Sequence, residues 1–274
     1  MLIIPLMVLG STGLHVILSP SLSLDNIPSV ASNYEPDYED LDRYMRIPAI
    51  FSGGLEIAFG NSKLFVNMDL RQEFSDYLMG DWLSNLPLST TSFLPAVDMN
   101  FPRLGYFEWR GSNSFISLGR RKLGLGLSTY SFVLSNYLPY FDHLWVELNG
   151  QAKSGEYIYD FFAVSADRTI SGGPKTLLGH RFCYMNDNLK VAFGEENLVY
   201  GAYPDLQDLG PFLIYHHTYQ SNSNVTATLS AEVKLSEVIA YGEFTLDDFR
   251  LASEGENSNP TAFGWVAGFL WRIS

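Results

Sequence analysis

The sequence predicts an all-β protein: an antiparallel up-and-down transmembrane β-barrel of about twelve strands. Helical periodicity is nearly absent from its 274 residues, and runs of β-branched and aromatic residues lie between Gly, Ser and Asn. Only 17% of the residues are charged, below the roughly 25% of a soluble domain, while 15% are aromatic. Short turns alternate with long loops, as they do in bacterial outer-membrane barrels.

The N-terminal segment is the first element. Residues 1–24 carry no charge, so the basic start of a signal peptide is missing, and Pro5, Gly10 and Pro20 interrupt the run that a membrane helix would need. We expect residues 1–11 to be the remnant of a signal peptide and residues 12–274 to form the barrel domain. The first predicted strand begins at Gly13.

Four two-residue turns, at 61–62, 112–113, 187–188 and 236–237, then fix which residues of each hairpin face each other. The predicted partners are Phe59 with Leu64 and Ile57 with Val66, Trp109 with Ile116 and Phe107 with Leu118, Tyr184 with Val191 and Phe182 with Phe193, and Val233 with Ala240 and Leu229 with Phe244. One face of every hairpin is therefore apolar.

The opposite face collects the charged residues of the strand centres; Arg120 and Glu195 are exceptions near strand ends. In a barrel the apolar face meets lipid and the charged face lines the lumen, although alternation alone also fits a soluble sandwich. Both signs of charge occur, so we expect ion pairs across neighbouring strands and a closed lumen. The predicted lumen residues are Glu56, Asp69, Arg71, Glu108, Arg110, Arg121, Arg181, Lys190, Glu232, Lys234, Glu243 and Asp247.

The long loops are predicted on the side opposite the short turns, and a modest turn near 150–155 joins two further strands. The count of twelve strands requires residues 212–219 to belong to a loop and not to a strand. The predicted loops cover residues 24–52, 72–103, 122–142, 166–176, 195–223 and 248–260.

Composition and motifs argue against several classes of protein. A net charge of −13 is the wrong sign for a nucleic-acid-binding surface, and one cysteine, Cys183, excludes an internal disulfide. We predict no metal site, because His216 and His217 are adjacent on an extended chain and point to opposite sides. Acidic residues at 35–42 fit a solvated loop that binds a cation weakly at most. We predict no enzyme, because Ser135 and His143 lie in nothing like a nucleophile elbow.

Several short motifs occur in the order shown by the Wzi-like capsule-assembly family of outer-membrane β-barrels, and over residues 105–273 the chain resembles that family. Each motif alone is weak, and their order carries the resemblance. The motifs are Leu118-Gly119-Arg120, Gly124-Leu125-Gly126, Leu134 to Leu144, Leu178-Gly179-His180-Arg181, Gly194-Glu195-Glu196, Pro211-Phe212 to His216-His217, Tyr241-Gly242-Glu243-Phe244 and Asp247-Asp248-Phe249.

The resemblance implies a protein of the bacterial outer membrane that binds capsular or other surface polysaccharide through its long loops, without chemical turnover. Its expected partners are outer-membrane lipid and polysaccharide, with no cofactor, and we expect a monomer. The runner-up is a porin-type channel for small solutes. The chain is shorter than such barrels and ends on Ser274 instead of an aromatic residue, so we expect an incomplete chain or a reduced relative that lacks a helical plug.

Sugars bind to aromatic faces and to polar groups that hydrogen bond hydroxyls, so the long loops are where we expect the binding residues. The same aromatic residues also fit the girdle that barrels place at the membrane interface. The predicted polysaccharide-binding residues are Tyr137, Tyr140, Asp142, Tyr203, Asp205, Tyr215, His216, His217, Tyr219 and Asn222.

Overall fold

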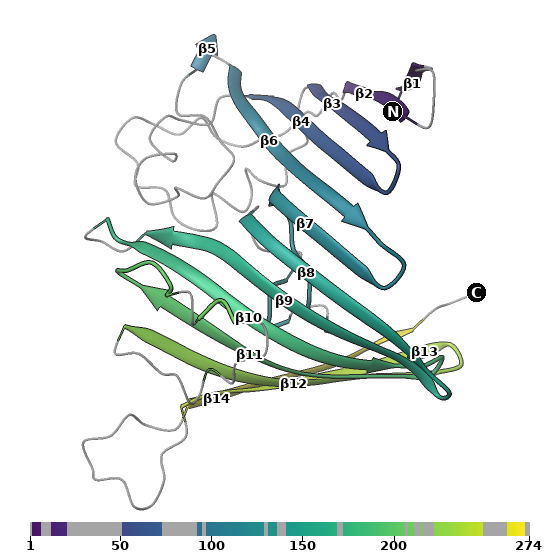
Figure 1. The fold of residues 1–274 in the computed structure, drawn as a ribbon, viewed down its shortest axis with the longest axis vertical. Coiled ribbons are helices and arrows are strands. Elements are labelled where there is room, and N and C mark those ends of the chain that lie inside the picture. The colour runs from purple at the N-terminus through teal and green to yellow at the C-terminus, as the bar shows by residue number, and fades with distance from the viewer. Residues whose placement is uncertain are drawn as a thin grey trace, which may run out of the picture. The chain divides into compact units, whose positions relative to one another are not determined.

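A computed structural model gives the fold of the chain (Figure 1). It divides the chain into two units, one of Met1–Trp109 with Ser117–Arg121 and the other of Arg110–Ile116 with Lys122–Ser274. The structure describes residues 2–6, 12–20, 51–72, 92–94, 97–128, 131–135, 141–168, 172–205, 208–210, 215, 222–248 and 262–271.

The first unit is an antiparallel sheet in which β2, β3, β4 and β6 follow one another as neighbours, with β1 beside β2 and the short β5 beside β6. The unit also holds most of β7. The strand bounds are β1 Leu2–Leu6, β2 Thr12–Pro20, β3 Phe51–Phe59, β4 Ser62–Gln72, β5 Ser92–Leu94, β6 Val97–Arg110 and β7 Ser114–Arg121.

The second unit is the curved sheet of β8–β14 in Figure 1, whose strands are again antiparallel and paired in sequence order. The bounds are β8 Phe141–Ala152, β9 Gly155–Arg168, β10 Pro174–Met185, β11 Leu189–Tyr200, β12 Ser223–Leu235, β13 Val238–Asp248 and β14 Ala262–Trp271.

The all-β, up-and-down antiparallel prediction is confirmed, and each of the twelve predicted strands has a counterpart. Two short strands, β1 and β5, are additional. Within residues 1–11, Leu2–Leu6 form the strand β1, and the role of this segment as a signal remnant stays a prediction. The described strand order begins with β1 and ends with β14, and these two strands are not paired with each other. The described pairings therefore do not close the sheet into a barrel.

Three of the four predicted hairpin turns are correct. In β10–β11, Tyr184 faces Val191 and Phe182 faces Phe193, and in β12–β13 Val233 faces Ala240. The turn after β6 is closed by a 2.8 Å hydrogen bond from the Gly111 backbone N–H to the Ser114 carbonyl, as the turn at 112–113 requires.

The predicted register of β3–β4 is wrong by two residues. Ile57 faces Leu64 and Phe59 faces Ser62, so the turn is Gly60-Asn61 instead of Asn61-Ser62. The reason is backbone geometry: Gly60 has φ of +56°, which glycine adopts without strain at the first position of a tight hairpin turn. Since a shift of two residues preserves the side-chain alternation, the two predicted faces survive the error.

The two faces of β10–β14 differ in the kind of side chain that they expose. One row of successive cross-strand partners is apolar and, from β10 onward, exposed: Phe182 on β10 is 54% exposed and Leu229 on β12 is 52% exposed. We call the face that carries this row the apolar face. The row runs through Tyr159, Phe182, Phe193, Leu229, Phe244 and Trp265.

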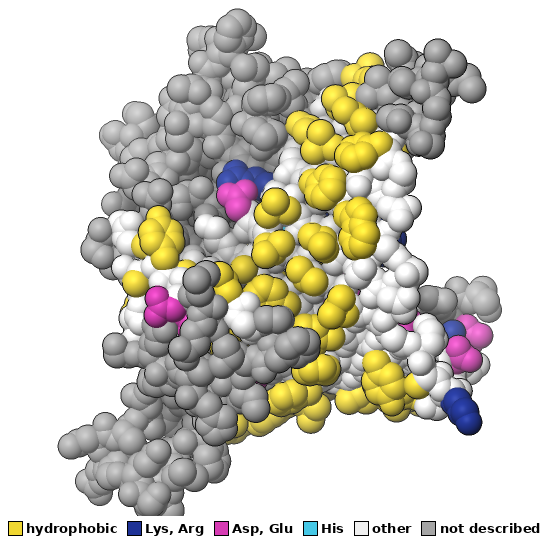
Figure 2. Space-filling view, viewed as in Figure 1, with side chains coloured by type: hydrophobic (Ala, Val, Ile, Leu, Met, Phe, Trp, Pro, Cys, Tyr) yellow, Lys and Arg dark blue, Asp and Glu magenta, His cyan; other side chains and the backbone are white. Residues whose placement is uncertain are grey.

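The opposite face, which we call the polar face, buries hydrogen-bonding and charged groups. Asp160 and Ser230 are among its buried residues, together with Glu243 and Thr245. Figure 2 shows hydrophobic side chains spread over the described surface with charged side chains at its margins. Water therefore has access to large apolar side chains, while polar side chains are packed away from it, so the apolar face needs a cover other than water.

Candidate functional site on the polar face of β8–β14

Asp160 is the centre of a polar cluster built from three neighbouring strands. Its carboxylate, with no exposed surface, accepts hydrogen bonds from Nε and Nη2 of Arg181 at 3.0 and 2.6 Å and from Nε1 of Trp145 at 3.0 Å. Asp160 and Arg181 are direct cross-strand partners, and the antiparallel register of β9 and β10 thus forms the ion pair.

Further ion pairs join neighbouring strands in each unit. Lys190 and Glu232 are cross-strand partners, 2.8 Å apart. In the first unit Glu108 pairs with Arg121 and, at 3.2 Å, with Lys63, which also lies 3.8 Å from Glu56. Opposite charges thus meet across strands in both units. Whether these residues line a lumen stays a prediction.

The other predicted lumen residues differ in their surroundings. Arg110 is exposed with its guanidinium over the ring of Phe115. Asp247 accepts hydrogen bonds from Asn224 and Thr226 at 2.6 and 3.1 Å, and Lys234 is exposed beside the turn. The side chains of Asp69 and Arg71 lie outside those that the structure describes.

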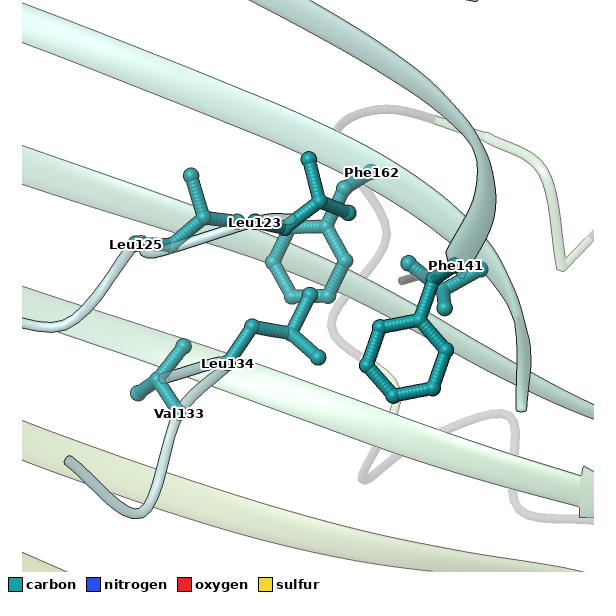
Figure 3. Packing of buried hydrophobic residues seen from close by; sticks show 7 residues of the cluster. Leu123, Leu125, Val133, Leu134, Phe141 and Phe162 are labelled. Carbon is teal, nitrogen blue, oxygen red and sulfur yellow. The ribbon is translucent and has the colours of Figure 1, made fainter. Parts of the chain in front are cut away.

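Two arms of the connection between β7 and β8, residues 122–128 and 131–135, pack on the polar face. We call them the inserted segment. Their backbones meet through a 2.9 Å hydrogen bond from the Leu125 N–H to the Leu134 carbonyl. Their buried side chains form a core with residues of β8 and β9 (Figure 3), and this core consists of Leu123, Leu125, Val133, Leu134, Phe141, Phe162 and Val164.

The inserted segment also binds a buried carboxylate on β13. Glu243 is 3% exposed and accepts hydrogen bonds from the hydroxyl of Ser131 at 2.9 Å, the hydroxyl of Ser128 at 3.2 Å and the backbone N–H of Phe132. Charge-assisted hydrogen bonds of this kind offset the cost of burying a carboxylate.

Sequence reasoning did not find this arrangement. It placed Gly124-Leu125-Gly126 in the predicted loop 122–142, and it placed Glu243 on the charged face without a partner in that loop. The one signal was the apolar character of Leu123, Leu125, Val133 and Leu134, which a solvated loop would not require.

The predicted polysaccharide-binding residues are only partly brought together. Asp142 is exposed at the start of β8, and Tyr203 is 82% exposed after the end of β11, near the exposed Asp205. All three lie at the end of the strands away from the two-residue turns. Asn222 hydrogen bonds to the backbone of Tyr200 and so extends the β11–β12 pairing. The remaining candidates outside the described residues are Tyr137, Tyr140, His216, His217 and Tyr219.

Tyr215 is not an exposed sugar-stacking residue in this structure. Its side chain has no exposed surface, and its ring stacks on His180 at 4.9 Å, over the apolar face of β10. Its backbone N–H donates to Glu195 at 3.0 Å, and Glu195 lies 3.6 Å from Nε2 of His180. Tyr215 packs in a buried cluster with Leu178, Val199 and Val225, and it contacts both members of the His180–Glu195 pair. Its role in polysaccharide binding stays a prediction.

The same contact explains why Glu195 departs from the predicted alternation. It shares the face of Phe193, but its carboxylate is covered by the backbone and ring of Tyr215 instead of by lipid or water. Burial raises the pKa of the Tyr215 hydroxyl above its ordinary value.

We expect Tyr215→Ala to lower the free energy of unfolding by about 3 to 5 kcal/mol, the range for truncating a large buried aromatic side chain. Thermal unfolding in detergent, followed by circular dichroism, measures the loss. Tyr203→Ala is the matched control, because that ring is exposed, and it should change stability by at most about 0.5 kcal/mol. Equal effects of the two substitutions would contradict the packing of Tyr215.

No group of three metal-ligating side chains occurs among the described residues, and no described helix has the length and apolar character to cross a membrane. Comparisons with protein-family models, with curated proteins and with solved structures found no match.

Proposed function

We propose that the chain is a bacterial outer-membrane β-barrel that holds capsular or other surface polysaccharide at its long loops, without chemical turnover. The observation that carries the proposal is the exposed apolar row on β10–β14, where Phe182, Leu229 and Trp265 are exposed, while Asp160 and Glu243 on the opposite face are buried. An apolar face of this kind is suited to contact with lipid. The paired strands can lie in lipid because their backbone N–H and C=O groups hydrogen bond to one another.

The polar face supports a scaffold more than an open channel. The inserted segment covers part of this face, and Asp160 is fully engaged by Arg181 and Trp145. A porin-type channel would need a path along these same residues. We therefore keep the channel as the competing function, and conductance separates the two.

The loop end of the strands supports polysaccharide binding. Tyr203 presents its ring to solvent, and Asp142 and Asp205 add exposed carboxylates at the same end of the sheet. An aromatic ring can stack on a sugar, and carboxylates accept hydrogen bonds from its hydroxyls. The resemblance to the Wzi-like family supports the same ligand class.

The test is binding of the detergent-folded protein to an array of acidic and neutral bacterial polysaccharides. We expect a selective response, and we expect Tyr203→Ala to weaken it by about 1 kcal/mol, roughly fivefold. Tyr157→Ala is the control, since this exposed tyrosine lies beside the two-residue turn at the opposite end of β9. A flat response of the wild-type protein, or equal losses in both variants, would contradict the proposal.

A further inference from the structure

We infer that the inserted segment is a plug that seals the lumen against ions and is held in place by Glu243. The inference rests on the proposed barrel, because only a closed barrel has a lumen to seal. It adds a defined closed state to that barrel, with one carboxylate as the point of attachment.

The attachment is specific. Two hydroxyls and one backbone N–H, from Ser128, Ser131 and Phe132, converge on the two carboxylate oxygens of Glu243. All three donors belong to the inserted segment. Burying a carboxylate without hydrogen-bond donors costs free energy. The buried position of Glu243 on β13 therefore stabilises the state in which the inserted segment is bound to it.

The segment reaches across the polar face. At one side its leucines pack on Phe162 of β9, whose ring lies over Gly179 of β10 at a position where a Cβ atom would clash with it. At the other side the ring of Phe132 lies against Gly264 of β14, where a Cβ atom would be 3.0 Å from the ring. The two arms also touch each other, since a Cβ atom on Gly126 would overlap the side chain of Ser131.

The segment thus contacts β9 at one side of the β9–β14 sheet and β14 at the other, and polar-face side chains between these strands, among them Ser230 and Glu243, are buried. Apolar packing and hydrogen bonds to one carboxylate hold the segment, without a covalent link. Removing the carboxylate should therefore release the segment while leaving every strand of the sheet in place.

The experiment is single-channel recording in planar bilayers with wild-type protein, Glu243→Ala and Glu232→Ala. The two variants each remove one carboxylate from the polar face, but Glu232 pairs with Lys190 and not with the inserted segment. We expect wild type and Glu232→Ala to be silent and Glu243→Ala to carry a steady current at least tenfold larger. Equal conductance in wild type and Glu243→Ala would overturn the plug.

A heat-modifiable band on a gel, boiled against unboiled, first shows that each protein has folded as a barrel. If wild type gives no such band in detergent, the barrel itself fails, and the inference of a plug fails with it. If only Glu243→Ala fails to fold, residues 123–134 are replaced by a Gly-Ser linker, which leaves the strands intact. A folded linker variant that is silent overturns the inference, and one that conducts supports it.

Discussion

Leu229→Arg should make folding into a bilayer less favourable by about 2 to 4 kcal/mol, because arginine on the lipid face of a barrel carries that cost near the midplane. Leu229 lies on the apolar face in the middle of β12, between Phe193 and Phe244 as cross-strand partners. Folding into lipid vesicles against a urea gradient measures the difference from wild type.

This substitution separates a membrane protein from a soluble one. Leu229 is 52% exposed, and at such a site in a soluble protein arginine would change stability by at most about 0.5 kcal/mol. Glu237→Arg, in the two-residue turn after β12, is the control, because the cost of arginine falls to about 0 to 1 kcal/mol near the interface. If Leu229→Arg folds as well as Glu237→Arg, the apolar face does not meet lipid.

Asp160→Ala should cost about 3 to 5 kcal/mol of stability, since it leaves the Arg181 charge buried without its partner. The loss also removes the acceptor for Nε1 of Trp145. Equilibrium unfolding in detergent gives the change in free energy. By contrast, Glu232→Ala breaks a pair whose Lys190 side chain is 37% exposed, and its cost should stay below about 1 kcal/mol.

A double-mutant cycle identifies the cause of the Asp160 effect. Adding Arg181→Met to Asp160→Ala removes the uncompensated charge, so the double variant should be more stable than Asp160→Ala alone. A double variant that is less stable by the sum of the two single losses would mean that the two side chains act independently, contrary to their 2.6 Å contact.

The hairpins show how far local sequence determines this fold. The turns at 187–188 and 236–237 predict their registers correctly because two residues with turn propensity separate two runs of clear alternation. At β3–β4 the run Gly60-Asn61-Ser62 offers two adjacent turns, and alternation cannot choose between them because both give the same faces. The positive φ of Gly60 decides the register.

The candidate site was less predictable, because it depends on contacts between residues distant in the chain. Alternation placed Glu243 and Arg181 on the polar face, and their partners across the sheet follow from register. The inserted segment binds Glu243, which lies more than a hundred residues further along the chain. No local sequence pattern predicts this contact. The burial of Tyr215 was not predictable for the same reason: a loop tyrosine is exposed by default, and tertiary packing on His180 buries this one.

Quenching of tryptophan fluorescence by brominated lipid tests the central claim most directly, since bromine quenches only the indoles that contact acyl chains. Trp265 is exposed on the apolar face, whereas Trp145 binds Asp160 on the polar face. In single-tryptophan variants reconstituted into vesicles, we predict strong quenching of Trp265 and little of Trp145. Equal quenching of both, or none of Trp265, would contradict a lipid-facing sheet.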